Sequence, residues 1–344
     1  MDVECPKRME YGPCAGVHDD GRCEVAAHRC GFLDSAPRRW AGIDRVTEPP
    51  RLPLGAASAT TVERLGRGQY IMSDFPIRDA DRSAVEAGAA VLGAAVDAVL
   101  IGEPPSVRVQ FPPAYRARLV GAAGATVWAT VNCRDRNRVA LEGELAGLAD
   151  AGVAVVNCVT GDHNRSGSRP DAQPVFDLDS TELVALARSI GLAASVGESP
   201  EVPPVDRRPA RFVEKAAAGA QLAFINLNSG PQAVKRFLSA CKELGAARPA
   251  MVCVPFVVDD GSAAIMTGVG GHMMPPGFLE GVLGARDRRE AGVVAAVGLA
   301  RKYLRLPGVA GVCLSGGATR GAEQAYAEAM AEAALELRGH LSHA

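Results

Sequence analysis

The chain has 344 residues, enough for one barrel-sized α/β domain and a modest additional module. Its formal net charge of −2 gives no electrostatic case for nucleic acid or an anionic membrane as a partner. Apolar residues make up 48% and aromatic residues only 5%, as is typical of buried parallel strands under small-residue helices. The sequence shows neither an apolar run of membrane-spanning length nor a secretion signal, so we expect a cytoplasmic protein.

Cysteine is concentrated at the start of the chain, where residues 1–34 contain Cys5, Cys14, Cys23 and Cys30. This segment is rich in Gly, Pro and Asp and lacks apolar periodicity, so it cannot bury enough surface to fold alone. Four thiolates around one tetrahedral zinc ion would supply the missing free energy. The spacing lacks a CxxC pair, so an iron–sulfur cluster or four free thiols remain as alternatives.

Residues 35–68 are rich in Pro, Arg, Ala and Gly, which predicts a linker with a short helix near 59–65. From residue 69 to 344, eight apolar runs alternate with helical patterns, which predicts a closed (β/α)8 barrel, with an open doubly wound sheet as the alternative. The predicted strands are 69–73, 97–102, 125–132, 153–160, 192–197, 222–227, 250–256 and 308–314. The predicted helices are 80–95, 113–122, 137–151, 180–190, 209–218, 231–244, 287–303 and 319–338.

Polar residues follow six consecutive predicted strands. In a barrel the carboxyl ends of the strands meet at one end, where loops converge polar groups on a ligand. We therefore expect a site there, although any one of these residues alone is as well explained as a loop residue or helix cap. The residues are Ser73, Asp74, Glu103, Asn132, Arg134, Asp135, Thr160, Gly161, Asp162, Glu198, Asn226 and Asn228.

Three motifs occur in order along this part of the chain: CRDRN at 133–137, TGDHN at 160–164 and PVFDLDS at 174–180. Together they resemble the methylenetetrahydrofolate reductase family, an FAD-dependent (β/α)8 barrel of one-carbon metabolism and methionine biosynthesis. The N-terminal CPKRMEYGPCAGV and DGRCEV resemble the cysteine-rich domain of these reductases, where the cysteines are associated with structural zinc. This chain departs in having Ala15 where a second Gly is usual, and in carrying the module at its N-terminus.

The resemblance assigns roles in holding the flavin. Asp162 matches an acid beside the flavin and the folate, where a carboxylate favours the cationic iminium that the folate must become. Asp179 and Ser180 match positions that hold the adenosine and diphosphate, and Ser180 would also begin a helix. Lys215 matches a lysine that contacts FAD, and Arg211 lies one helical turn earlier. The expected cofactor-binding set is Thr160, Gly161, Asp162, Asp179, Ser180, Arg211 and Lys215.

The substrate and acid positions follow the family less closely. Asn226 stands where the family has Gln in a Thr-Gln pair that contacts folate and nicotinamide; the expected substrate set is Asn226, Asn228 and Glu198. At the first strand, Ser73 falls on the position of the family's general acid, a Glu. Because neighbours on a strand point to opposite faces, Asp74 can replace that acid only if the strand has already ended. The expected catalytic set is Asp162, Glu103 and Asp74.

These observations predict a reductase that converts 5,10-methylenetetrahydrofolate to 5-methyltetrahydrofolate with FAD and NAD(P)H. Two alternatives remain: a folate-dependent one-carbon or methyl transferase on the same barrel, and a non-catalytic subunit that docks a partner through the cysteine module. A homo-oligomer is compatible with either. The loss of the usual acid at Ser73 motivates the transferase alternative.

Overall fold

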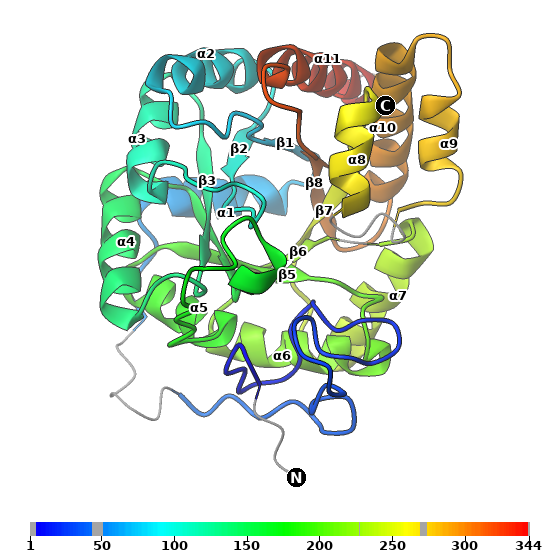
Figure 1. The fold of residues 1–344 in the computed structure, drawn as a ribbon. Coiled ribbons are helices and arrows are strands. Elements are labelled where there is room, and N and C mark those ends of the chain that lie inside the picture. The colour runs from blue at the N-terminus through cyan, green and yellow to red at the C-terminus, as the bar shows by residue number, and fades with distance from the viewer. Residues whose placement is uncertain (1–4, 43–50, 227, 269–273, 343–344) are drawn as a thin grey trace.

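The chain forms a closed barrel of eight parallel strands in a computed structural model that describes residues 5–42, 51–226, 228–268 and 274–342 (Figure 1). Each strand pairs with the next, and β8 closes the ring on β1 with Tyr70 opposite Gly311. The barrel prediction is confirmed, with every strand boundary within two residues of its expected place. The strands are β1 (Tyr70–Asp74), β2 (Ala98–Ile101), β3 (Val127–Asn132), β4 (Val155–Val159), β5 (Ala193–Glu198), β6 (Leu222–Ile225), β7 (Ala250–Pro255) and β8 (Val309–Ser315).

Helices surround the sheet and bury its outer face (Figure 1). The connection between β7 and α10 also contains two short helices that the sequence pattern did not predict, α8 (Asp260–Gly268) and α9 (Phe278–Leu283). The surrounding helices are α2 (Arg82–Gly93), α3 (Pro113–Ala122), α4 (Arg138–Asp150), α5 (Ser180–Ser189), α6 (Arg208–Ala218), α7 (Pro231–Glu243), α10 (Arg288–Leu304) and α11 (Glu323–Ser342). Short 3-10 turns lie at Asn164–Ser166 and Val205–Arg207. In the described residues, no helix is long and apolar enough to cross a membrane.

Side chains alternate along each strand between the inside of the barrel and the helices outside. On β1, Tyr70 and Met72 belong to the cluster that fills the barrel, together with Trp128 and Phe224. Ile71, the residue between them, belongs to the outer cluster beneath the helices. This phase decides which polar residues at the strand ends face a ligand.

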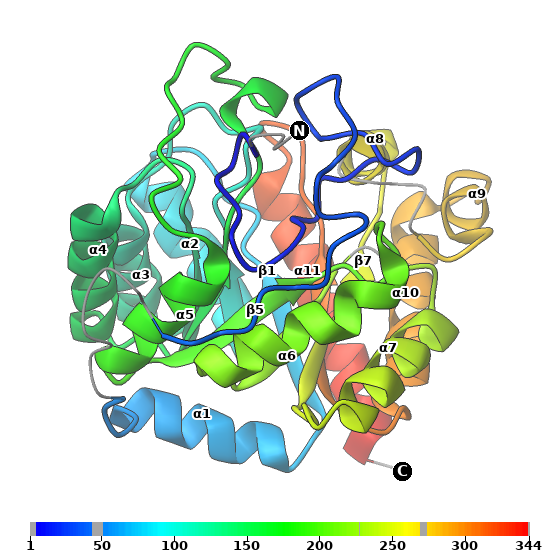
Figure 2. The same ribbon diagram turned by 90° about the horizontal axis from the view of Figure 1, so that it is seen from below.

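The two ends of the barrel are covered differently (Figure 2). Helix α1 (Ala56–Gly66) lies across the end where the strands begin, and the segment 5–42 lies at the other end, which we call the mouth, and over α6. Between the two, the chain passes α5, where Leu52 N donates to Arg188 O at 3.1 Å and Gly55 N to Gly191 O at 2.9 Å. The N-terminal module is therefore placed where loops carry function in such barrels.

Candidate active site

Asp74, the last residue of β1, points into the mouth, because it shares the inward phase of Tyr70 and Met72. Its carboxylate accepts hydrogen bonds from Gly316 N at 3.1 Å and from the Cys313 thiol at 3.9 Å. Burial raises the pKa of Asp74 to about 6, against the opposing charge of Arg78 and these two bonds. A carboxyl group with such a pKa can hold a proton near neutral pH and give it up to a ligand.

Ser73 points the other way, into the packing between β1 and the helices. It is fully buried, and its Oγ has no hydrogen-bond partner in the described residues. The expectation that Asp74 could replace the family's acid only past the end of the strand is therefore wrong, because Ser73, on the matching position, is the residue that faces the helices. Asp74 is still within β1, and the phase of the strand turns it inward.

A row of polar side chains crosses the mouth from Asp74 along β8, β7 and β6. Cys313 and Cys253 are direct neighbours on β8 and β7, and the Cys253 thiol donates to Asn226 Oδ1 at 2.8 Å. Burial raises the pKa of Cys313, so this thiol stays protonated and acts as a donor. Both cysteines belong to the cluster that fills the barrel, and the inward phase of their strands places them at its upper end, beside Asp74 and Asn226.

A second polar group lies deeper in the barrel, below the mouth. Ser195 Oγ donates to Asn157 Oδ1 at 3.1 Å, and Asn157 Nδ2 donates to Thr130 Oγ1 at 3.4 Å. Gly197 lies one step nearer the mouth on β5, where an added Cβ would be 3.7 Å from the Asn226 amide. The absence of a side chain at Gly197 leaves the Asn226 amide uncovered on that side.

Asp162 lies in the loop that follows β4, three strands along the ring of eight from β1 and Asp74. Although its carboxylate reaches solvent, the protein packed around it raises its pKa, an effect that Lys7 and Arg134 oppose. Gly161 precedes it with φ +89°, a conformation that glycine adopts without strain. Asp74 and Asp162 thus both lie at the carboxyl ends of strands, on different sides of the mouth.

Lys7 and Glu24, which the sequence analysis did not single out, hold this loop from the N-terminal module. Lys7 Nζ donates to Gly161 O at 2.9 Å and forms a buried ion pair with Glu24. Glu24 in turn accepts from His163 N at 2.8 Å and from Ser166 Oγ at 2.9 Å. The contacts join positions more than 130 residues apart, so nothing in the local sequence could have signalled them.

Glu103, the other predicted acid, is held in place by hydrogen bonds from neighbouring residues. Its two carboxylate oxygens accept from both terminal nitrogens of Arg136, at 2.6 and 3.0 Å. The same carboxylate accepts from Asn132 N at 3.1 Å and from Asn132 Nδ2 at 2.9 Å. Both carboxylate oxygens are thus engaged by protein donors that hold Glu103 in place, whereas Asp74 lies at the mouth, so the geometry favours Asp74 as the acid.

Two of the three predicted substrate residues face away from the mouth. Glu198 follows the outward phase of β5 and pairs with Lys215 at 2.8 Å. Asn228 is buried, accepts from Tyr303 Oη at 2.7 Å, and accepts from Gly230 N at 3.1 Å at the start of α7. Asn226 alone of this set faces the interior of the barrel, with Cys253.

The residues expected to hold the flavin are brought together, but each already has protein partners. Asp179 begins α5, with a capping box completed by Glu182, and pairs with Arg211 at 3.2 Å. Ser180 begins the helix as expected, with Asp179 rather than Ser180 as the N-cap, and its N–H donates to Thr160 Oγ1 at 3.1 Å. Lys215 donates to Glu198 and to Gly197 O at 3.0 Å. Arg211 Nε alone of these buried donors has no partner in the described residues, and the ion pairs of Arg211 and Lys215 are closed off from solvent, so the set does not fit a flavin dinucleotide in this arrangement.

The four N-terminal cysteines line one small cavity of about 20 Å³, together with Lys7 and Glu24. A short antiparallel bridge between Arg22 and Arg29 brings the last two cysteines together. Burial raises the pKa of Cys5 and of Cys30, and the neighbouring thiols raise both further. Within the described ranges, no three Cys, His, Asp or Glu side chains already stand as ligands of a metal ion, so zinc is not shown.

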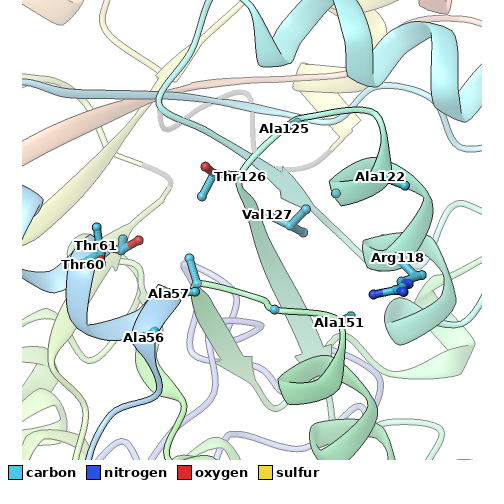
Figure 3. Close-up of a pocket in the computed structure, with 13 residues that line it drawn as sticks. Ala56, Ala57, Thr60, Thr61, Arg118, Ala122, Ala125, Thr126, Val127 and Ala151 are labelled. Atoms are coloured by element: carbon cyan, nitrogen blue, oxygen red, sulfur yellow. The ribbon is translucent and has the colours of Figure 1, made fainter.

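A cleft of about 670 Å³ lies at the other end of the barrel, between α1, α3 and the starts of β3 and β4 (Figure 3). Ala, Gly and Thr make up most of its lining, and Arg118 supplies a charge. In barrels of this kind the end where the strands begin serves stability, so we do not assign the active site there.

No protein-family model matches the chain, and no curated protein matches it in sequence. Among solved structures, a Clostridium thermocellum protein that binds two copies of 5-methyl-5,6,7,8-tetrahydrofolic acid is similar over 82% of this chain and 100% of its own, with TM-score 0.61 and 12% identity. A 2,3-dimethylmalate lyase of the PEP mutase/isocitrate lyase superfamily matches over 85% of both chains, with TM-score 0.47 and 12% identity. A mutant tryptophan synthase α-subunit from Pyrococcus furiosus covers 79% of this chain and 98% of its own, with TM-score 0.48 and 12% identity. At these identities the comparisons show the fold alone: the chain is a (β/α)8 barrel.

Proposed function

We propose that the protein reduces 5,10-methylenetetrahydrofolate to 5-methyltetrahydrofolate with NAD(P)H at the mouth of the barrel. The observation that carries this proposal is Asp74: an inward carboxyl at the end of β1 whose pKa burial raises to about 6. Opening the five-membered ring of the substrate requires a proton on N10, and an acid of this pKa supplies one near neutral pH. The folate-binding neighbour of the same fold, with TM-score 0.61, is compatible with this substrate class.

The other residues of the mouth have roles that follow from their chemistry. Protonation by Asp74 lets the bond between the methylene carbon and N10 break, which leaves a cationic iminium at N5. The Asp162 carboxylate, in the loop after β4, stabilises that positive charge. Hydride from NAD(P)H then adds to the methylene carbon and completes the methyl group. The Asn226 amide, fixed by Cys253 at 2.8 Å, orients the pterin or the nicotinamide.

We further propose that Cys5, Cys14, Cys23 and Cys30 hold one structural zinc ion. The support is that all four line a single cavity of about 20 Å³, close to the volume needed for one water-sized sphere. Thiolates are the ligands that zinc prefers, and a closed set of four is typical of structural sites. An iron–sulfur cluster needs the same ligands but more room, so we rank it second.

The test of the reaction is a direct assay of the purified protein. We expect NAD(P)H to be consumed only with methylenetetrahydrofolate present, and 5-methyltetrahydrofolate to accumulate in equal amount. Binding of 5-methyltetrahydrofolate without any oxidation of NADH or NADPH would contradict the reductase and favour the one-carbon transferase. Binding of neither folate nor nucleotide would leave the docking-subunit alternative. Metal analysis of the same sample is expected to give one zinc per chain.

A further inference from the structure

The N-terminal module rests directly on the residues that the family resemblance assigns to the adenosine and diphosphate of FAD. Asp179 Oδ2 accepts from Tyr11 N at 3.4 Å. Arg208, at the start of α6, donates to Pro13 O at 3.3 Å and to Cys14 O at 2.9 Å. The backbone of residues 11–14 thus forms hydrogen bonds with residues at the starts of α5 and α6, and Figure 2 shows this segment beside α6.

The contact between the module and α6 leaves no space for a ligand. Gly12 has φ +133°, and a Cβ added to it would lie 2.8 Å from Cδ of Arg211. The ion pair of Arg211 with Asp179 beneath it has side chains only 1% and 0% exposed. An adenosine group could reach these two side chains only after the module had moved away.

Apart from Arg211 Nε, which is buried and has no partner in the described residues, the donors that would bind a diphosphate already have partners. At the start of α5, Ser180 N donates to Thr160 Oγ1 at 3.1 Å and Thr181 N to Asp179 at 2.6 Å, so the first helical N–H groups are used. Lys215 is neutralised by Glu198 at 2.8 Å. Anion binding would have to break these bonds without a gain in charge pairing.

We infer that the N-terminal module permanently occupies the space that the adenosine diphosphate half of FAD would take. We infer also that hydride passes to the folate directly from the nicotinamide. The reaction part of this inference rests on the proposed reductase function, whereas the occupied site does not. The step is balanced without a flavin: the C4–H bond of NAD(P)H breaks, its electron pair forms the new C–H bond at the methylene carbon, and NAD(P)⁺ leaves. Asp74 supplies the one proton, to N10.

The module also does for the mouth what a bound cofactor would otherwise do, since it holds the loop that carries Asp162. Lys7 Nζ fixes Gly161 O at 2.9 Å, and Glu24 fixes His163 N at 2.8 Å. Gly161 and His163 flank Asp162 on both sides. The position of this carboxylate is therefore set by a protein segment rather than by a dissociable ligand.

Isotope transfer tests the direct hydride step. With NADH carrying two deuterium atoms at C4, in ordinary water and without added flavin, we expect each product methyl group to retain one deuterium. A reduced flavin exchanges its N5 hydrogen with water, so loss of the label, or a need for added FAD, would overturn the inference. If no folate is reduced with or without FAD, the proposed function fails while the occupied site is still testable.

Flavin content and titration test the occupied site independently of activity. We expect the full-length protein to purify colourless and to leave the fluorescence of added FAD without a saturable change. Stoichiometric bound flavin, or saturable FAD binding that Asp179→Ala weakens, would overturn the inference.

A second variant tests the docking of the N-terminal module against α6. Gly12→Ala places a Cβ against Arg211 at a positive φ, and we expect proteolysis within residues 5–42 to become about ten-fold faster. Gly124→Ala is the matched control, because Gly124 also has a positive φ, +93°, but no atom within 4 Å of the added Cβ. Equal protease resistance of both variants and the wild type would contradict the seating.

Discussion

Replacing Asp74 by Asn should separate activity from stability in one variant. Asn keeps the shape of the side chain but cannot give a proton, so the acid step is lost. Loss of a positioned general acid typically costs about 10²–10⁴-fold in rate, and we expect kcat to fall within that range. The wild type should lose activity about ten-fold per pH unit above pH ~6, because only protonated Asp74 is competent.

The same substitution should stabilise the fold at neutral and alkaline pH. Asp74 has its pKa raised from 3.8 to about 6, which is about 2 units, and each unit corresponds to about 1.4 kcal/mol. The folded state therefore binds more protons than the unfolded state between these values, so the stability of the wild type falls as pH rises through this window and is constant above it. The ionised carboxylate thus costs at most about 3 kcal/mol above pH ~6.

Asn removes this cost but keeps only one of two accepted hydrogen bonds, from Gly316 N and Cys313, a loss of about 1 kcal/mol. We expect Asp74→Asn to be more stable than the wild type by about 2 kcal/mol at pH ~8 and less stable by about 1 kcal/mol at pH ~4. Urea unfolding across this pH range measures both differences.

Ser73→Ala is the matched control, because Ser73 lies next in sequence but faces outward with an unpartnered hydroxyl. It should leave both kcat and the pH dependence of stability unchanged. A difference between Asp74→Asn and the wild type that does not vary with pH would refute the raised pKa of Asp74. Full activity in Asp74→Asn would refute its role as the acid.

Further substitutions distinguish structural from catalytic charges. Glu103→Gln should cost about 3 kcal/mol of unfolding free energy, measured in urea, because it leaves Arg136 partly buried and unpaired; a large fall in kcat without loss of stability would contradict its structural assignment. Lys215→Met should lower the free energy of unfolding by about 3–5 kcal/mol, because it leaves the buried Glu198 carboxylate, 2% exposed, without its partner. The double variant with Glu198→Gln should recover most of that loss in the same denaturation assay. Removal of zinc with a chelator, or Cys14→Ser, should make residues 5–42 protease-sensitive while far-ultraviolet circular dichroism of the barrel is retained; an unchanged digestion pattern would argue against the metal.

The barrel could be predicted from the sequence because its signal is local. Runs such as 153–160 are apolar and β-prone by themselves, and they alternate with amphipathic helices at barrel spacing. The short helices α8 and α9 were not predicted, because six to nine residues span too few helical turns for an apolar periodicity to be recognised. Helix α5 begins at Ser180 as expected, and Asp179 caps it because its carboxylate accepts from Thr181 N and completes a capping box with Glu182.

The candidate site was less predictable, because it depends on strand phase and on distant contacts. One residue of phase separates Asp74, which faces the mouth, from Ser73, which faces the helices, and motif matching alone does not fix that phase. The contacts of Tyr11 with Asp179, and of Lys7 and Glu24 with the loop that carries Asp162, depend on where the N-terminal module docks. That information lies in tertiary packing, for which the sequence spacing gave no signal.

The docking of the module also constrains the order in which the protein can assemble. Lys7 donates a hydrogen bond to the carbonyl of Gly161, 154 positions later, and Arg208 donates one to the carbonyl of Pro13, 195 positions earlier. The segment 5–42 is therefore synthesised well before residues 161–208, which form the surface that it docks on. During that interval its four thiols are exposed to oxidation and to competing metals. Early capture of a zinc ion would protect the nascent segment before its permanent contacts exist.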